Sequence, residues 1–207
     1  MAQIAFPQLG VYFVTREPVR APAPLAAFAA VRAELDRRLP GTKVAGSLSA
    51  TTQNRFAIAA CPDGLGRAPE SSLSEVYEYD PVRYSAMVIG LVEPPAETPV
   101  HWIARRVNPA ANLVAVVPAP PSLSKAVVVQ PAPRGYLGDP RFLLDLGRLL
   151  KGREAAAIEG TGLVLIGKGP ASLARALKAA VGAPPRKAPA RKRAPKEGRA
   201  KRVAKRK

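Results

Sequence analysis

The sequence predicts an α+β protein in which a mixed, largely antiparallel sheet is covered by helices and followed by a disordered tail. Hydrophobic residues make up 47% of the 207 residues, which is enough to bury a core. Segments with strand and helix patterns mix irregularly, with several strands in succession. This order favours such a sheet over a doubly wound βαβ array. Positive charge is gathered at the C-terminus, where 12 of the 32 Lys and Arg residues lie in the last 24 positions.

The first elements are predicted from periodicity and from turn residues. Residues 9–15 are apolar, β-branched and aromatic, which predicts a short strand. Residues 25–39 carry apolar side chains at helical spacing between two proline boundaries, which predicts a helix. A Gly/Ser segment begins at Gly46, and neither a strand nor a helix is predicted for it. A strand at 55–60 follows, and Cys61-Pro62-Asp63-Gly64 is predicted to end it in a turn.

The later elements follow the same rules. Strands are predicted at 76–79 and 84–92, and Pro94-Pro95 ends the second one. Thr98 is predicted to cap a helix that has Pro99 at its first position and stops at Asn108-Pro109. The remaining predicted elements are strands at 113–117, 126–130, 155–158 and 163–166, and helices at 141–151 and 171–181.

The composition excludes several classes of protein. One cysteine, Cys61, rules out an intrachain disulfide framework. One histidine, His101, and one cysteine cannot supply the three or four nitrogen and sulfur ligands of a zinc site, although carboxylates could still hold a hard cation. No window approaches about 18 apolar residues, so no transmembrane helix is expected. The N-terminus lacks the basic region of a signal peptide, and we therefore expect a cytoplasmic protein, with nucleoid or ribosome association possible in principle.

The C-terminal segment 184–207, which we call the basic tail, is predicted to be separate from a folded domain at 1–183. The basic tail holds 12 Lys/Arg and one Glu, a net charge of +11 out of the chain's +17. Its composition cannot offset the entropy of ordering, so we expect disorder. Neutralised phosphates release counterions, so such a segment attracts nucleic acid without reading its sequence, and it has no aromatic residue to stack on bases. An anionic membrane surface and a solubilising role without a partner are the alternatives.

The predicted nucleic-acid contacts are the twelve cations of the basic tail. They are Arg186, Lys187, Arg191, Lys192, Arg193, Lys196, Arg199, Lys201, Arg202, Lys205, Arg206 and Lys207.

Three groups of segments occur in an order and spacing that point to a known family. They are Gly46–Ser49 with Arg55-Phe56 and Cys61–Gly64; Pro94–His101 with Asn108-Pro109 and Val114–Pro121; and Gly152–Ala155 with Glu159–Lys168. These segments resemble the class II aldolase/adducin family. They are similar to its Gly-Asn-Leu-Ser loop and Thr-Pro-Ser-Gly turn, its Pro-Ser-Ser-Glu-x-Pro-x-His helix start and His-Thr-His-Pro strand end, and its Gly-His-Gly strand pair. The resemblance spans roughly residues 25–181.

The resemblance implies a layered α/β/α fold, commonly tetrameric, in which three histidines hold a divalent metal that polarises a carbonyl. The matching positions in this sequence are Pro118, Pro120 and Thr161. Proline has no side-chain ligand atom, and a threonine hydroxyl alone is a poor zinc ligand. We therefore predict that the metal site is lost and that no cofactor is bound.

The family's phosphate cradle is altered as well. Its Asn falls on Ser47, the Ser of its turn on Asp63, and its Ser-Ser pair on Pro95-Ala96. A carboxylate at Asp63 would repel a phosphate instead of donating to it. Phosphate binding by this route is not expected.

Glu97 matches the family's general acid/base and is the one vestigial catalytic candidate. Without the Lewis acid a base has little to act on, so Glu97 is predicted to remain as an acid favoured by the helix dipole. His101 is predicted to be a packed, hydrogen-bonded residue and Trp102 to pack its helix. Cys61 is not expected to be a nucleophile, because Asp63 lies nearby in the turn.

The sequence thus predicts a non-catalytic class II aldolase-like scaffold, a pseudoenzyme, that forms homo-oligomers and binds nucleic acid or a ribonucleoprotein through its basic tail. One alternative is a metal-independent or carboxylate-metal enzyme of aldolase or epimerase type, with Glu97 as base and a small carbonyl substrate. Another is an adducin-like protein that interacts with the cytoskeleton or a membrane surface.

Overall fold

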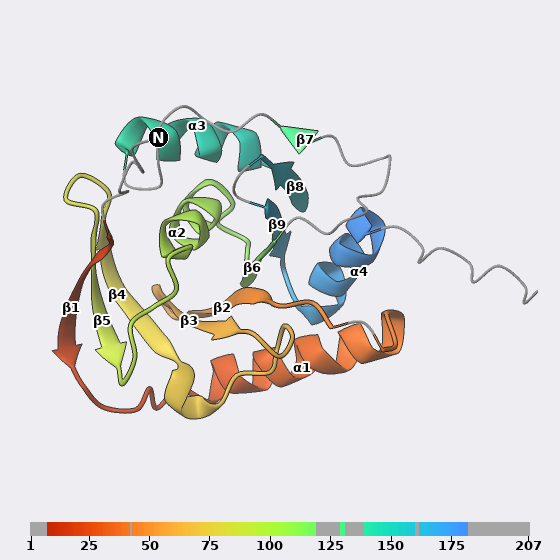
Figure 1. Ribbon diagram of the computed structural model, residues 1–207, viewed down its shortest axis with the longest axis horizontal. Helices are drawn as coiled ribbons and strands as arrows, with labels where there is room; N and C mark the ends of the chain where they lie inside the picture. The colour runs from red at the N-terminus through yellow and green to blue at the C-terminus, as the bar shows by residue number, and fades with distance from the viewer. Residues whose placement is uncertain (1–7, 42, 119–128, 131–138, 160–161, 182–207) are drawn as a thin grey trace, which may run out of the picture.

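The computed structural model describes residues 8–41, 43–118, 129–130, 139–159 and 162–181, and within them it contains four helices and nine strands (Figure 1). The helices are α1 (Pro22–Arg38), α2 (Thr98–Val107), α3 (Pro140–Leu150) and α4 (Pro170–Val181). The strands are β1 (Gly10–Thr15), β2 (Gly46–Thr52), β3 (Arg55–Cys61), β4 (Ser74–Asp80), β5 (Ser85–Gly90), β6 (Leu113–Val117), β7 (Val129–Gln130), β8 (Ala155–Ile158) and β9 (Gly162–Gly167). A short 3-10 turn at Glu70–Ser72 precedes β4.

The described strands form one sheet in the order β1-β5-β4-β3-β2-β6-β9-β8-β7. The pairs β1–β5 and β7–β8 are parallel, and the other neighbouring pairs are antiparallel. The prediction of a mixed, largely antiparallel sheet is therefore confirmed. β2 lies near the middle of the sheet, between β3 and β6.

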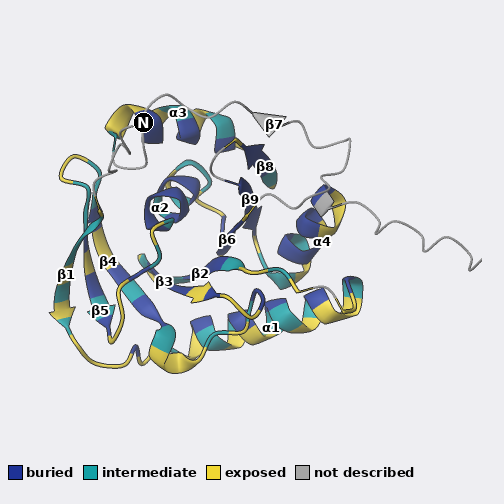
Figure 2. Ribbon diagram, in the orientation of Figure 1, coloured by how far each residue is buried: buried dark blue, intermediate teal, exposed yellow. Residues whose placement is uncertain are grey.

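Helices cover the sheet on both faces, which gives three layers. One core lies between the sheet and the pair α1 and α4, and it includes Phe28, Leu48 and Leu177. The second core lies between the opposite face of the sheet and the pair α2 and α3, and it includes Ile58, Val114 and Leu146. Figure 2 shows the buried sides of all four helices turned toward the sheet. The expected α/β/α layering is thus present, because each helix buries one apolar stripe.

The Gly/Ser segment at Gly46, for which no strand was predicted, is a strand in the structure. Residues 46–52 form β2, which pairs with β3 from Gly46 to Thr52 and with β6 from Ser47 to Ala50. The segment lacks β-branched apolar residues before its two threonines, so its own pattern was too weak to predict a strand. The segment becomes a strand because its backbone hydrogen-bonds to β3 on one edge and to β6 on the other, and these are tertiary interactions. Cys61 likewise lies at the end of β3 and not in the following turn.

The start of α2 also differs from the prediction. Thr98 is the first residue of the helix, not its cap, and its hydroxyl donates to the carbonyl oxygen of Pro95 at 2.6 Å. Glu97 occupies the cap position, and its carbonyl accepts from the amides of Val100 and His101. The C-terminal end of this helix, at Val107, agrees with the predicted stop.

The boundary between a domain and a tail at residue 183 lies outside the described residues, and so do all twelve cations of the basic tail. Strand residues 126–128 of the predicted strand at 126–130 also lie outside them. Within the described part of the chain, none of the helices combines the length and apolar character needed to cross a membrane.

Candidate functional site

One part of each of the three groups of family-like segments lies at one end of the sheet, which we call the vestigial end, whereas Arg55-Phe56, Asn108-Pro109 and Gly152–Ala155 lie toward the other end. Gly46 of β2 pairs with Cys61 of β3, and Ser47 pairs with Val116 of β6. On the other side of β6, a Cβ placed on Gly162 would lie 2.3 Å from the carbonyl oxygen of Val117, and Gly162 has a φ of +103°. Glycine is needed at this position because the neighbouring backbone leaves no room for a side chain. Gly46, Cys61, Val117 and Gly162, from the three groups, therefore lie together at this end.

The residues at the vestigial end do not fit a divalent metal of the family type. Pro118 directly follows β6 and is exposed, and it offers no ligand atom. Pro120 and Thr161 lie outside the described residues, and their side chains bring no nitrogen, sulfur or carboxylate ligand. Among the described residues, no group of three or more His, Cys, Asp and Glu side chains comes together. The prediction that this chain binds no cofactor remains a prediction.

The remaining family positions at this end are spread over surface and core. Asp63 and Ala96 are exposed, whereas Ser47 is only 2% exposed and is turned into the protein. The Ser47 hydroxyl is hydrogen-bonded to His101 inside the protein, at 2.9 Å from Nε2. Glu97 is half-buried at the start of α2. The vestigial end thus brings the predicted positions together without assembling a phosphate cradle.

A buried polar network runs from the vestigial end along the α2 face of β2. Ser47, Ser49 and Thr51 lie on this face because alternate residues of a strand point to the same side. His101 and Arg105 lie four residues apart on α2 and so point from one side of the helix. Two residues of a strand span about 6.6 Å and one turn of a helix about 5.4 Å, so the two rows of side chains remain in register.

The hydrogen bonds define the direction of this network. Arg105 Nη2 donates to Ser49 Oγ at 2.8 Å, and Ser49 Oγ lies 2.8 Å from His101 Nδ1. Ser47 Oγ lies 2.9 Å from His101 Nε2. We assign the Ser49 hydroxyl as donor to Nδ1 and the Nε2–H as donor to Ser47, because this arrangement satisfies both ring nitrogens of a neutral imidazole.

The network removes His101 from any acid–base role. Its side chain is 0% exposed, and burial together with the positive charge of Arg105 lowers the pKa of His101 to about 3. A Ser–His pair needs an imidazole that can accept a proton near neutral pH, with an acid behind it to stabilise the resulting charge. Here a cation lies behind the imidazole. The prediction that His101 is packed and hydrogen-bonded is confirmed.

Arg105 is the charged member of the network, and it has only neutral partners. Its guanidinium donates to the hydroxyl of Thr51, to that of Ser49 and to the carbonyl oxygen of Ala111, the last at 3.1 Å. Among the described residues no carboxylate forms an ion pair with it, and its Nε is buried without a hydrogen-bond partner. Burial lowers the pKa of Arg105 to about 9, so it remains a cation at neutral pH.

Two further predicted residues lie apart from this network. Cys61 is fully buried, and burial raises the pKa of its thiol, so it is not an activated nucleophile. The raised pKa of the thiol is caused by burial, whereas the sequence alone indicated the neighbouring Asp63 as its cause. Trp102 packs against Tyr79 with ring centroids 5.1 Å apart, as a helix-packing residue would. It also lines an open pocket at the C-terminal end of α2.

Sequence reasoning missed Ser49, Thr51 and Arg105. Their signal was present: alternate Ser-x-Ser-x-Thr in one segment and His-x-x-x-Arg in another. It could not be recognised without knowing that the first segment is a strand and that it lies under α2.

Comparison with solved structures shows that the chain has the class II aldolase fold. YgbL of Escherichia coli, a candidate aldolase/epimerase/decarboxylase, matches with a TM-score of 0.51 and 18% identity over 73% of this chain and 81% of that one. YgbL of Klebsiella pneumoniae matches with a TM-score of 0.52 and 19% identity over 75% and 84%. An L-fuculose 1-phosphate aldolase matches with a TM-score of 0.52 and 14% identity over 76% and 82%.

The similarity is confined to the fold. No family model matches the sequence. No curated protein matches it either. At identities of 14% to 19% the activities of these structural relatives do not transfer to this chain.

Proposed function

We propose that this protein is a non-catalytic class II aldolase-like scaffold whose basic tail binds nucleic acid or a ribonucleoprotein without sequence specificity. The observation that carries the proposal is the lack of metal-ligand side chains at the family's metal positions. The fold is retained, but the family's metal positions read Pro118, Pro120 and Thr161, and the chain's one imidazole is held in a buried network. A metal-dependent aldol reaction has no ligand set to use there.

The charge distribution supports the partner class. The basic tail carries a net charge of +11, whereas the other 183 residues carry +6. Each phosphate that a lysine or arginine neutralises releases counterions, so twelve cations in 24 residues supply strong, salt-sensitive attraction. In a homo-oligomer several tails would act together and raise the avidity for a long polyanion.

Binding of labelled duplex DNA and hairpin RNA, followed by fluorescence anisotropy over a range of salt concentrations, tests the proposal. The full chain is compared with a full-length variant in which the twelve tail cations are replaced by Gln, which we call the tail-neutral chain. A tail that contacts about six phosphates loses about 10³-fold in affinity between about 50 and 200 mM salt. We expect this steep dependence for the full chain and at least a 100-fold weaker affinity, about two powers of ten, for the tail-neutral chain.

A matched control shows whether any surface charge would do. Arg37 of α1 and Arg175 of α4 are exposed, and Arg37→Gln/Arg175→Gln removes cations outside the tail. We expect this variant to bind like the full chain. Equal binding by the full and tail-neutral chains would contradict the tail as the binding element.

The alternatives give different results. If the chain is an enzyme with Glu97 as base, purified protein turns over a carbonyl substrate in an aldol-cleavage screen, and Glu97→Gln abolishes the turnover. Stoichiometric zinc in the purified protein would also contradict the non-catalytic proposal. An adducin-like role predicts that the chain co-sediments with filaments or anionic vesicles in preference to nucleic acid.

A further inference from the structure

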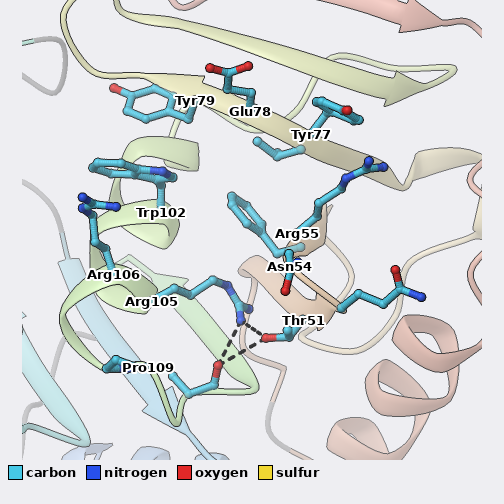
Figure 3. Close-up of a pocket in the computed structure, with 14 residues that line it drawn as sticks. Thr51, Asn54, Arg55, Tyr77, Glu78, Tyr79, Trp102, Arg105, Arg106 and Pro109 are labelled. Atoms are coloured by element: carbon cyan, nitrogen blue, oxygen red, sulfur yellow. Dashed lines mark hydrogen bonds between the residues drawn. The ribbon is translucent and has the colours of Figure 1, made fainter.

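An open pocket of about 290 Å³ lies at the opposite end of α2 from Glu97, and we call it the arginine pocket. It is lined by the β2–β3 turn, by β4 and by the last residues of α2, and Figure 3 shows the side chains that define it. Arg55 and Tyr77 stand on one side, Trp102 and Arg106 on the other, and Arg105 lies between them. The pocket therefore has three guanidinium groups and several aromatic rings.

The charge of the arginine pocket is not balanced. Its lining contains three arginines and one carboxylate, that of Glu78. Among the described residues, none of the three guanidiniums forms an ion pair, although other arginines, such as Arg32 with Asp36, do. Arg105 gives the strongest indication of an anionic ligand. It is a partly buried cation that has only neutral partners, so an anion brought close to it would stabilise its charge.

The aromatic rings of the pocket are paired with arginines. The guanidinium carbon of Arg55 lies 3.7 Å from the ring centre of Tyr77, and that of Arg106 lies 5.5 Å from the ring of Trp102. Tyr77 is 44% exposed, at a position where the β4–β5 register shifts and an extra residue turns outward. Each pair presents a flat, cationic surface, which is the kind of surface on which unpaired bases stack.

A second hollow of about 460 Å³ adjoins the arginine pocket. The two share Pro109 and Ala111, at the loop between α2 and β6. Lys151, Arg153 and Lys168 line the second hollow, with Glu154 as its one carboxylate. The described surface at this end therefore carries two adjoining hollows with basic linings, which together we call the groove, and aromatic side chains lie in one of them.

We propose that this groove binds a short stretch of single-stranded nucleic acid, with an unpaired base against Tyr77 or Trp102 and phosphates along the cations. Cations line both hollows and aromatic rings line one, and stacking on such rings demands bases that are free of a duplex. The inference takes its partner class from the proposed function but rests on different residues. The basic tail supplies charge without any aromatic residue, and the groove supplies the stacking surface that the tail lacks.

The position of Trp102 gives a direct test. It is the only tryptophan of the chain and it lines the pocket, so a base that stacks beside it changes the intrinsic tryptophan fluorescence. The tail-neutral chain is titrated with an oligothymidylate of about 12 nucleotides, within the usual range for one such site. Parallel titrations use the same strand in a duplex and a single nucleoside monophosphate.

We expect saturable quenching by the single strand, little by the duplex, and much weaker binding of the mononucleotide. Tyr77→Ala removes a stacking surface and should weaken binding about 5- to 100-fold. Arg55→Gln/Arg106→Gln should lower the salt slope of the affinity by about 1.4, since each phosphate contact with a single strand contributes about 0.7. The control Arg37→Gln/Arg175→Gln on the opposite layer of helices should leave quenching and slope unchanged. Circular dichroism verifies that each variant is folded.

Several results would overturn the inference. They are absence of binding by the tail-neutral chain, equal binding of duplex and single strand, or an unchanged salt slope in Arg55→Gln/Arg106→Gln. Equal affinity for the mononucleotide would also overturn it, because the pocket would then hold a free nucleotide and not a strand. If the full chain fails to bind duplex but the quenching occurs, the proposed function of the tail is wrong and the groove inference stands.

Discussion

Helix α2 begins at the vestigial end and finishes in the arginine pocket, so its two ends can be compared on one scaffold. At the first end Glu97 precedes the helix, and the chain's one imidazole, that of His101, is buried in its first turns. At the second end Arg105 and Arg106 face an open hollow without ion-pair partners among the described residues. β2 contributes to both ends, with Ser47 at one and Thr51 at the other. β6 ends at Val117 near the first, and the loop that precedes it places Ala111 at the second.

The difference lies in what each end offers a ligand: no cluster of metal-binding side chains occurs among the described residues, whereas three guanidinium groups line the arginine pocket. Pro118, the one family metal position that the structure describes, directly follows β6 in a connecting segment, where substitution does not disturb the packed layers. The buried network belongs to the layers themselves and separates the two ends. Its hydrogen bonds keep the His101 side chain buried between Ser47 and Ser49. The bonds that Arg105 donates to Thr51 and Ser49 position its guanidinium at the pocket.

The largest expected effect on the free energy of unfolding comes from removing a hydroxyl of the buried network. Ser49 accepts from a cation and bonds to His101, so Ser49→Ala removes two buried hydrogen bonds and should lower the free energy of unfolding by about 3 kcal/mol. Ser47→Ala removes one neutral bond and should cost about 1 kcal/mol. Ser72→Ala, at a half-exposed serine that bonds to a nearby carbonyl, is the control and should cost less than about 0.5 kcal/mol. Urea unfolding measures all three, and equal costs for Ser49 and Ser72 would contradict the network.

The next effect concerns pH. The pKa of His101 falls from an ordinary 6.5 to about 3 in the folded protein, so the unfolded chain binds the proton first as the pH drops. His101 therefore contributes stability that is fully present above about pH 6.5 and is lost toward pH 3, at about 1.4 kcal/mol per pH unit.

The variant His101→Gln isolates this contribution, because the chain has no other histidine. Between pH 7 and pH 4 the unmodified protein should lose about 3 kcal/mol more stability than the variant. Parallel curves for the two proteins, measured by urea unfolding at each pH, would show that the imidazole is not held neutral.

A smaller effect is expected at Cys61. Its thiol is buried and its pKa is raised, so a thiol reagent should reach it only when the structure opens. We expect the native protein to react at least about 100-fold more slowly than the urea-unfolded chain. Fast reaction in the native state would mean that the vestigial end is open in solution.

The smallest effect is expected at Glu97. The side chain is half-buried and at the cap position of α2, and no described side chain donates to it. Glu97→Gln should change the free energy of unfolding by less than about 0.5 kcal/mol and leave nucleic-acid affinity unchanged. A larger change in either would give the vestigial end a role that the account denies.

Much of the fold could be predicted from the sequence. The predicted helices at 25–39, 99–107, 141–151 and 171–181 have bounded, periodic apolar patterns, and each is present within a few residues. β2 could not be predicted, because its small residues become a strand only through pairing with β3 and β6.

The two ends of α2 also differ in how far they could be predicted from the sequence. The vestigial end could be located because its motifs are contiguous and their order is specific to the fold. The arginine pocket could not, because Arg55, Tyr77 and Trp102 come from three separate segments and meet only in the folded sheet. Trp102 was expected only to pack its helix, and its packing against Tyr79 is indeed present. Its place in a pocket depends on residues far away in the chain.

Mapping where a single-stranded oligonucleotide cross-links to the full-length protein under ultraviolet light compares the two ends most directly. Peptide mass spectrometry then identifies the modified residues. The account predicts adducts at Tyr77 and Trp102 of the arginine pocket and on peptides from the basic tail, with none around Ser47, Asp63 or Glu97. Adducts concentrated at the vestigial end, with the arginine pocket unmodified, would contradict it.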